Sequence, residues 1–308
     1  MASQFVDTIS FYDQYHGHDL EMLQAILASL RKHRNNERKD QSDRPVVFFA
    51  GDSSLDNKYW IDGWAKSVNG YEDILRDVQL QSHMKQDVSY WTNLELMRKM
   101  PGTCALNTSV EATTLRQRQP GLFSGGLTEQ DELIRDEITE NDYLVVSIGG
   151  NDIALSPTLS TIASMLAMMK FAEDEDLEEG SAWGFSHFKD LFGDQIQQYV
   201  EKLVSKRKPR RILICMIYYP DEAGQGSWAD RALSALDYNA NPHRLQKAIA
   251  SLFEQATKEI QVQGATIVPV PLFSVMNGKV TDDYVSRVEP SEQGGKKMAE
   301  LLVAKLLE

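Results

Sequence analysis

Residues 45–57 read PVVFFAGDSSLDN, an unbroken apolar run that passes directly into a polar turn. The run does not alternate apolar with polar residues, which predicts a strand buried on both faces, as in a parallel sheet covered by helices. Four further runs of this kind follow along the chain, at 103–106, 143–148, 211–219 and 265–270.

Segments with helical spacing of apolar residues separate these runs. They lie at 19–33, 90–100, 128–138, 159–173, 187–206, 242–260 and 292–307. Strands that alternate with helices predict an α/β fold, a three-layer α/β/α sandwich around a parallel sheet of about five strands. We expect one domain at 45–308, preceded by an N-terminal helical extension and a polar linker at 1–44.

The composition excludes several classes of partner. The 308 residues carry a formal net charge of −13, which disfavours nucleic acid or an anionic membrane surface as the main partner. No stretch approaches the roughly 20 apolar residues of a membrane span, and the first residues show no secretory signal. Cys104 and Cys215 lie in apolar runs, so we expect reduced core cysteines and a cytoplasmic protein.

Residues 156–190 do not fit the alternation of strands and helices. They hold a Met-rich helix, the acidic run EDEDLEE and then several aromatic residues. The acidic run is typical of a solvated surface. The Met and Phe residues predict either ordinary core or the wall of an adaptable apolar pocket, such as a lid or an acyl-chain wall.

Residues with chemical uses follow the predicted strands. In a parallel sheet, ligands bind beyond the carboxyl ends of the strands, so the segments after each strand meet at one edge. Ser53 follows the first strand, where it can expose a hydroxyl and an N–H at the start of a helix. Asn151 follows Gly149 and Gly150, and its amide can donate to an oxyanion. Taken alone, each also fits an ordinary helix cap or turn.

The combination of GDSSLDN at 51–57, SIGGNDIALSP at 147–157 and a final PS at the start of the last helix resembles the SGNH hydrolase superfamily, also called GDSL esterases and lipases. The resemblance covers roughly residues 45–308 and implies an SGNH-hydrolase or flavodoxin-like sandwich. It implies Ser53 as nucleophile, with the Ser53 N–H and the Asn151 side chain as oxyanion donors. The family's second block supplies a glycine N–H, and NTSVEATT places Ala112 there, or Glu111 if the alignment shifts by one.

The last block departs from the family pattern. The family carries Asp-x-x-His before the last helix, whereas this chain has Ser286 and Glu289 in those places. Serine can donate a hydrogen bond to a carboxylate, so the pair predicts a swapped donor and acceptor, with Ser286 positioning Glu289. Arg287 lies between them and is expected to favour the ionised form of Glu289.

Three hypotheses about Glu289 remain open. It is a general base, although its reference pKa of about 4.3 lies below the 6.5 of histidine unless burial raises it. Alternatively, the protein is a catalytically inactive binding or regulatory protein that uses the same pocket. In the third hypothesis another histidine serves as base, with His243 the best candidate. A glutamate base predicts activity well below pH 6, where a histidine base fades.

The sequence thus favours a serine esterase or lipase-like hydrolase acting on a small-molecule carboxylic ester, with no cofactor and no metal. GQGSWA at 224–229 matches a dinucleotide pattern but lies several residues after its strand, which indicates a flexible loop. Asp52, Asp56, Asp152 and Glu289 form an acidic rim without metal-ligand spacing, so a divalent ion is not expected there.

Overall fold

The computed structural model describes residues 5–32, 44–78, 81–119 and 126–308. Its central sheet has five strands, all parallel, in the order β6-β2-β7-β8-β9. These strands are β2 (Val46–Gly51), β6 (Cys104–Asn107), β7 (Tyr143–Ser147), β8 (Arg211–Met216) and β9 (Ile267–Pro271). The five predicted strands and the α/β class are therefore confirmed.

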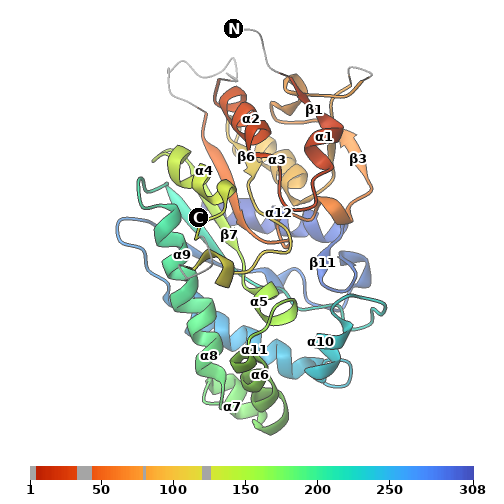
Figure 1. Ribbon diagram of the computed structural model, residues 1–308, viewed down its shortest axis with the longest axis vertical. Coiled ribbons are helices and arrows are strands. Elements are labelled where there is room, and N and C mark those ends of the chain that lie inside the picture. The colour runs from red at the N-terminus through yellow and green to blue at the C-terminus, as the bar shows by residue number, and fades with distance from the viewer. Residues whose placement is uncertain (1–4, 33–43, 79–80, 120–125) are drawn as a thin grey trace.

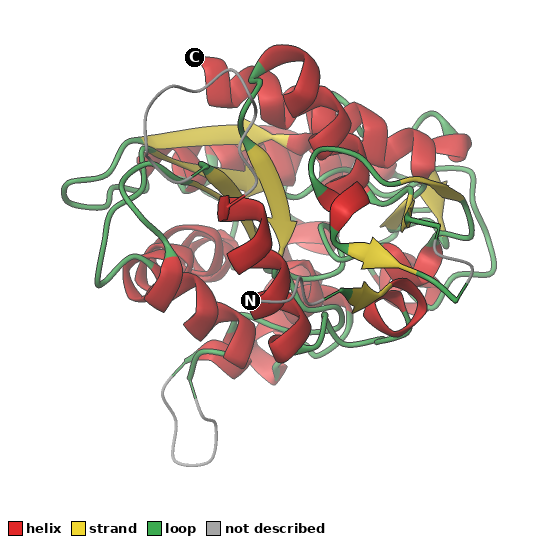
Figure 2. Ribbon diagram, turned by 90° about the horizontal axis from the view of Figure 1, so that it is seen from above, coloured by secondary structure: helices red, strands yellow, loops and turns green. Residues whose placement is uncertain are grey.

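Helices cover both faces of this sheet (Figures 1 and 2). The helices are α1 (Thr8–Tyr12), α2 (Leu20–Lys32), α3 (Val88–Lys99), α4 (Glu129–Glu137), α5 (Gly150–Ala154), α6 (Leu159–Phe171), α7 (Asp174–Glu179), α8 (Phe185–Asp190), α9 (Ile196–Leu203), α10 (Asp230–Ala235), α11 (Pro242–Gln255) and α12 (Glu292–Leu307). The helix predicted at 187–206 is α8 and α9 joined by a π-helical turn at Leu191–Gln195.

Successive residues of each strand point to opposite faces, and this divides the core in two. Phe48 of β2 packs on the face covered by α2, α9 and α11, whereas Phe49 packs on the face covered by α3 and α12. The two cysteines follow the same rule, because Cys104 and Cys215 belong to opposite faces and are both free and buried. They are core thiols, as the sequence predicts.

The N-terminal helix α2 belongs to the main core. Its buried residues Leu23, Ile26 and Leu30 pack into the cluster that covers one face of the sheet. The polar linker predicted between this helix and the sheet lies outside the described residues, apart from Arg44. The boundary at residue 44 therefore stays a prediction.

Short strands that the sequence does not predict lie outside the central sheet. They are β1 (Val6–Asp7) with β4 (Leu75–Arg76), β3 (Trp64–Lys66) with β5 (His83–Lys85), and β10 (Tyr284–Val285) with β11 (Glu289–Pro290). Strands of two or three residues are too short to show an alternation of apolar and polar residues, so the sequence pattern does not predict them.

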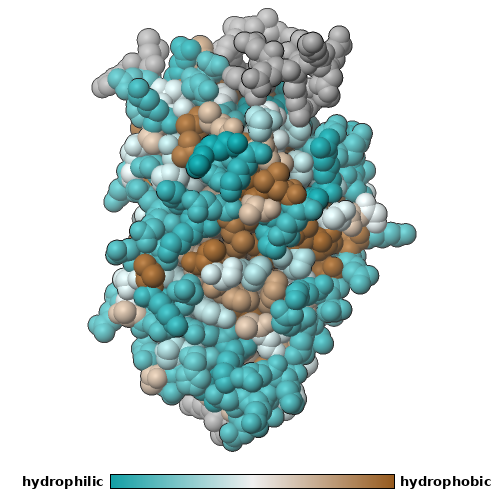
Figure 3. Space-filling model, turned by 180° about the vertical axis from the view of Figure 1, so that it is seen from behind, coloured by the Kyte–Doolittle hydropathy of each residue, from teal (hydrophilic) through white to brown (hydrophobic). Residues whose placement is uncertain are grey.

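The surface is mostly hydrophilic, in keeping with the charge of −13. Seen from behind, apolar residues gather in a band across the middle of the molecule (Figure 3). None of the helices in the described residues is long and apolar enough to cross a membrane.

The end of β2 lies unusually close to β7, and Gly51 makes this possible. Gly51 has φ +139°, and a Cβ built on it would lie 1.8 Å from the Ser147 carbonyl oxygen. Only glycine combines this backbone conformation with this approach. The position of the turn that follows β2 therefore depends on Gly51.

We predict that Gly51→Ala lowers the thermal unfolding midpoint strongly or prevents folding, because the added methyl group collides with backbone. The matched control is Gly193→Ala, since a Cβ there meets Ala256 Cβ at an ordinary 3.5 Å. Calorimetry of both variants gives the comparison. A Gly51→Ala midpoint equal to that of the control would contradict the close approach.

Candidate active site

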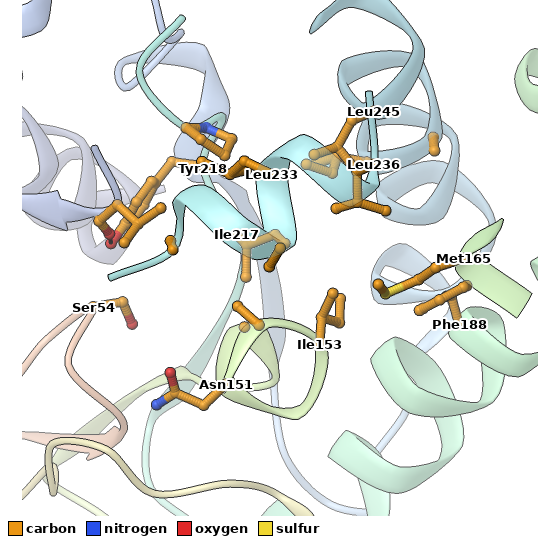
Figure 4. Close-up of a pocket in the computed structure, with 18 of the residues that line it drawn as sticks. Ser54, Asn151, Ile153, Met165, Phe188, Ile217, Tyr218, Leu233, Leu236 and Leu245 are labelled. Carbon is orange, nitrogen blue, oxygen red and sulfur yellow. Dashed lines mark hydrogen bonds between the residues drawn. The ribbon is translucent and has the colours of Figure 1, made fainter. Parts of the chain in front are cut away.

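Segments that follow the central strands bring the predicted site residues to one edge of the sheet. Ser53 follows β2, Asn151 is the second residue of the short helix α5 after β7, and Glu289 lies in β11, beyond β9. These three residues line one pocket, and Figure 4 shows Asn151 in its wall. The loop after β6 carries Ala112 to the neighbourhood of Asn151, whose Nδ2 donates to the carbonyl of the next residue, Thr113, at 3.0 Å.

The turn after β2 presents Ser53 to the pocket. Asp52 N–H donates to the Ser147 carbonyl at 3.1 Å, and Asp52 Oδ1 accepts from the N–H and the hydroxyl of Ser54. Asp52 and Ser54 are thus engaged in holding the turn. No acceptor within the described residues is recorded for the Ser53 N–H, so this donor is available to a ligand.

Ala112 adopts the conformation that the glycine of this family block would take without strain. Its φ is +57°, in the left-handed region where a side chain is disfavoured. The N–H of Glu111 donates to Asp56 Oδ2 at 2.9 Å, whereas no acceptor for the Ala112 N–H is recorded among the described residues. The geometry therefore favours Ala112 over Glu111 as the backbone donor.

Asn151 is positioned by the turn that begins at Gly149. Gly149 has φ +113°, and a Cβ there would lie 3.0 Å from the Phe192 ring. One Nδ2 proton of Asn151 is used on Thr113, which leaves the second for a ligand. The neighbouring Asp152 accepts from the N–H groups of Leu115 and Arg116 at 2.7 and 3.1 Å, which ties the donor loop to the end of β7.

Glu289 is almost fully buried, with 2% of its surface exposed. Burial raises the pKa of Glu289 to about 7. The side chains of Ser53 and Trp228 oppose this rise, and the charges of Asp52 and Asp56 add to it. One carboxyl oxygen, Oε2, is buried with no hydrogen-bond partner in the described part of the chain. The carboxyl thus combines contact with Ser53 and a proton affinity close to that of histidine.

Ser286 does not hold Glu289, contrary to the donor–acceptor pair that the sequence predicts. Among the described residues the two side chains make no hydrogen bond with each other, and it is the side chains of Ser53 and Trp228 that lower the pKa of Glu289. Ser286 is instead a turn residue between β10 and β11, with φ +48°, and its carbonyl accepts from the Ser227 hydroxyl. The three-residue spacing from Ser286 to Glu289 therefore belongs to a tight turn and not to a hydrogen-bonded pair.

Arg287 also differs from its predicted role. Its guanidinium donates to the Asp221 carbonyl at 3.0 and 3.2 Å and to Asp230 at 2.9 Å. The Arg287 guanidinium thus binds the loop after β8. The pKa of Glu289 is raised, not lowered as the sequence predicts from Arg287.

Three residues that the sequence analysis did not single out fix the position of Glu289. Tyr218 Oη donates to the Val288 carbonyl at 2.6 Å, and Asn57 Nδ2 donates to the Pro290 carbonyl at 2.9 Å. Trp228 reaches Glu289 from the loop that precedes α10. Tyr218 and Trp228 come from the loop after β8. Because loops after parallel strands lie at the binding edge of the sheet, the position of this loop could have indicated both residues.

A second buried carboxyl, Glu111, lies beside the site. Burial raises the pKa of Glu111 to about 8, and the charges of Asp56 and Glu289 add to this effect. Its Oε1 accepts from Trp60 Nε1 at 2.7 Å, while Asp56 pairs with the fully buried Lys58 at 2.7 Å. Asp56 and Asp152 therefore serve as acceptors for backbone and lysine donors. The described residues contain no group of three or more His, Cys, Asp or Glu placed to bind a metal ion.

No described histidine lines the pocket that holds Ser53. His243 lies at the start of α11, half exposed, with Nε2 3.6 Å from Asp174. His16 approaches the Glu111 carbonyl, and His18 is buried against Phe11. His33 lies outside the described residues. The structure thus places Glu289, and no described histidine, beside Ser53.

Several solved structures resemble the chain in fold. An acetylxylan esterase from Geobacillus stearothermophilus is 13% identical over 85% of this chain and 94% of its own, with a TM-score of 0.42. An extracellular lipase from Streptomyces rimosus is 13% identical over 85% and 99%, with a TM-score of 0.40. A putative acylhydrolase from Bacteroides fragilis is 13% identical over 92% and 95%, with a TM-score of 0.41.

The likeness to these proteins is one of fold. Neither a protein-family model nor a curated protein matches the sequence.

We predict that Ser286→Gly raises the thermal unfolding midpoint and keeps wild-type hydrolysis. A non-glycine residue at φ +48° is strained, and glycine relieves that strain. Calorimetry and an ester assay measure the two effects. A loss of activity in Ser286→Gly with an unchanged fold would show that the Ser286 hydroxyl is needed at the site.

From the raised pKa values of the buried carboxyls, we predict that the thermal unfolding midpoint falls as pH rises from 6.5 to 8.5. Their folded pKa values lie above the unfolded ones, so the native state binds more protons and stability is lost as these groups ionise. Glu111, with a pKa of about 8, and Glu289 and Asp87, with pKa values of about 7, titrate in this window. His18, with a lowered pKa, acts in the opposite direction only below about pH 6.5.

Glu111→Gln should flatten this dependence, because it removes one buried titration. Exposed Glu300→Gln is the matched control and should leave the slope unchanged. Scanning fluorimetry from pH 6.5 to 8.5 measures the thermal unfolding midpoint of each variant. A wild-type midpoint that rises between pH 6.5 and 8.5 would contradict the raised pKa values.

Proposed function

We propose that this protein is a serine hydrolase of carboxylic esters, which works through an acyl-Ser53 intermediate with Glu289 as its general base. The observation that carries the proposal is the buried carboxyl of Glu289, which lines the same pocket as Ser53 and whose pKa burial raises to about 7, against the lowering effect of the Ser53 side chain. A base with this proton affinity is half deprotonated near neutral pH, where general-base catalysis is efficient.

In the first step, Glu289 takes the proton of the Ser53 hydroxyl as the oxygen attacks the carbonyl carbon of the ester. The carbonyl oxygen becomes an oxyanion. Three donors support it: the N–H groups of Ser53 and Ala112 and the second Nδ2 proton of Asn151. Preorganised donors of this kind each contribute about 10²- to 10³-fold to the rate.

In the second step, the tetrahedral intermediate expels the alcohol, which takes the proton from Glu289. Water then attacks the acyl-Ser53 carbonyl, and Glu289 accepts its proton in turn. Collapse of this intermediate returns the proton to Ser53 and releases the carboxylic acid. One ester and one water thus give one acid and one alcohol, and the enzyme returns to its starting state.

The pKa of Glu289 changes the expected pH dependence. An exposed glutamate base predicts activity well below pH 6. With a pKa of about 7, Glu289 is mostly protonated at pH 6 and cannot accept the Ser53 proton. Activity should therefore fall on the acid side much as it does with a histidine base.

We predict that kcat/KM for an aryl ester rises with pH through about 7 and that Ser53→Ala abolishes it. Glu289→Gln should lower kcat by about 10²- to 10⁴-fold, the usual contribution of a general base. Asn151→Ala should lower kcat by about 10²-fold through loss of one oxyanion donor. Steady-state rates from pH 4 to 9 test all three, with Glu300→Gln as the control carboxyl substitution.

The outcomes separate this proposal from an inactive binding protein. Wild-type protein that is inert at every pH, while Glu289→His turns over, would mean that the site is a hydrolase scaffold held inactive. Activity that survives in Ser53→Ala would place the chemistry elsewhere. Full activity at pH 5 would contradict the buried base.

A further inference from the structure

The pocket that holds Ser53 has a volume of about 140 Å³ and extends away from the polar groups along an apolar wall. Figure 4 shows Ser54 and Asn151 on one side of the pocket and Met165 and Phe188 on the other. The charged and hydrogen-bonding side chains that line it gather around Ser53, Asn151 and Glu289, and the remaining wall is apolar. A ligand that fills this pocket is polar at one end only.

The far wall of the pocket comes from three segments of the chain. The insert predicted at 156–190 contributes Met165 and Met168 of α6 and Phe188 of α8. The other two segments are α10 and α11, which contribute Leu233 and Ile249. All five side chains are at least nine-tenths buried, so this end is enclosed by core residues. Figure 1 shows α6, α8 and α11 grouped together at the lower end of the molecule.

We propose that the substrate is an ester of a medium-chain fatty acid, whose apolar acyl tail occupies this cavity while its carbonyl lies at Ser53. This inference rests on the proposed function and adds the acyl group that the site selects. It also assigns the insert at 156–190 the role of acyl-chain wall.

The cavity favours the acyl group over the alcohol for a kinetic reason. The alcohol must leave before water enters, which requires an open path. The acyl group stays covalently bound to Ser53 through the second half of the reaction. An enclosed apolar end suits the group that remains.

The size of the cavity sets the preferred chain length. A cavity of about 150 Å³ lined by Leu, Ile and Phe binds benzene, a ligand of about six carbons. The pocket of about 140 Å³, polar end included, therefore holds an acyl chain of about six carbons. The methionine side chains can shift to admit a somewhat longer chain, since methionine is unbranched and flexible.

The first test compares p-nitrophenyl esters from acetyl to palmitoyl. Each methylene buried in the cavity should raise kcat/KM about fourfold until the cavity is filled. We expect a rise of at least tenfold from acetyl to hexanoyl or octanoyl, and no further rise beyond about ten carbons. An acetyl ester hydrolysed as fast as the octanoyl ester would overturn the proposal.

Substitutions in the wall should move this preference. Met168→Ala enlarges the cavity and should shift the optimum to longer acyl chains, whereas Ala248→Met fills it and should lower the octanoyl-to-acetyl ratio about tenfold or more. Met97→Ala is the matched control, because Met97 is half exposed on α3, on the opposite face of the sheet. Equal ratios in all three variants would contradict the assigned wall.

A second series tests the placement of the acyl group. With the octanoyl group held constant, lengthening the alcohol from ethyl to octyl should change kcat/KM less than threefold. A strong dependence on alcohol length with none on acyl length would reverse the assignment.

Binding to Ser53→Ala separates failure of this inference from failure of the proposed function. Calorimetry should give at least tenfold tighter binding of the octanoyl ester than of the acetyl ester. If it does, and wild type hydrolyses neither, the pocket assignment holds and the hydrolase proposal fails. If wild type hydrolyses both equally and Ser53→Ala binds both equally, the hydrolase proposal holds and the acyl assignment fails.

Discussion

Removal of the Glu289 carboxyl from water is the interaction on which this site depends. A carboxylate loses its hydration when buried, so burial favours the neutral acid and raises its pKa. Glu289 is 2% exposed, and its pKa of about 7 is near the usual value for histidine. Burial thus supplies the proton affinity that the side chain lacks in water, and the side chains of Ser53 and Trp228 oppose that rise.

The same burial connects the base to the rest of the fold. Tyr218 and Asn57 hold the strand that carries Glu289, and both reach it from the ends of central strands or the turns that follow them. Glu289 also forms part of the lining of the apolar pocket. An acyl chain that fills this pocket would lie beside the carboxyl, so substrate and base share one wall of the pocket in the proposed reaction.

The sequence was sufficient for the sheet and for part of the site. Continuous apolar runs predicted all five strands. The turns after β2 and β7 predicted Ser53 and Asn151 as candidate site residues, because each residue follows its strand directly in the sequence. The residues that position Glu289 could not be predicted in this way. Trp228 and Glu289 are separated by some 60 residues, and only the folded chain brings a loop after β8 against a hairpin after β9. The spacing from Ser286 to Glu289 suggested a contact, but both Ser286 and Arg287 adopt left-handed conformations that belong to a turn.

The most direct test is the protonation of the Glu289 carboxyl itself. Infrared difference spectra between wild type and Glu289→Gln, recorded from pH 4 to 9, isolate the carbonyl stretch of the protonated acid. The account predicts that this band disappears with a midpoint near pH 7. A midpoint near 4.5, the ordinary value of a glutamate, would show that the carboxyl is solvated and ionised, and would contradict a buried base at this site.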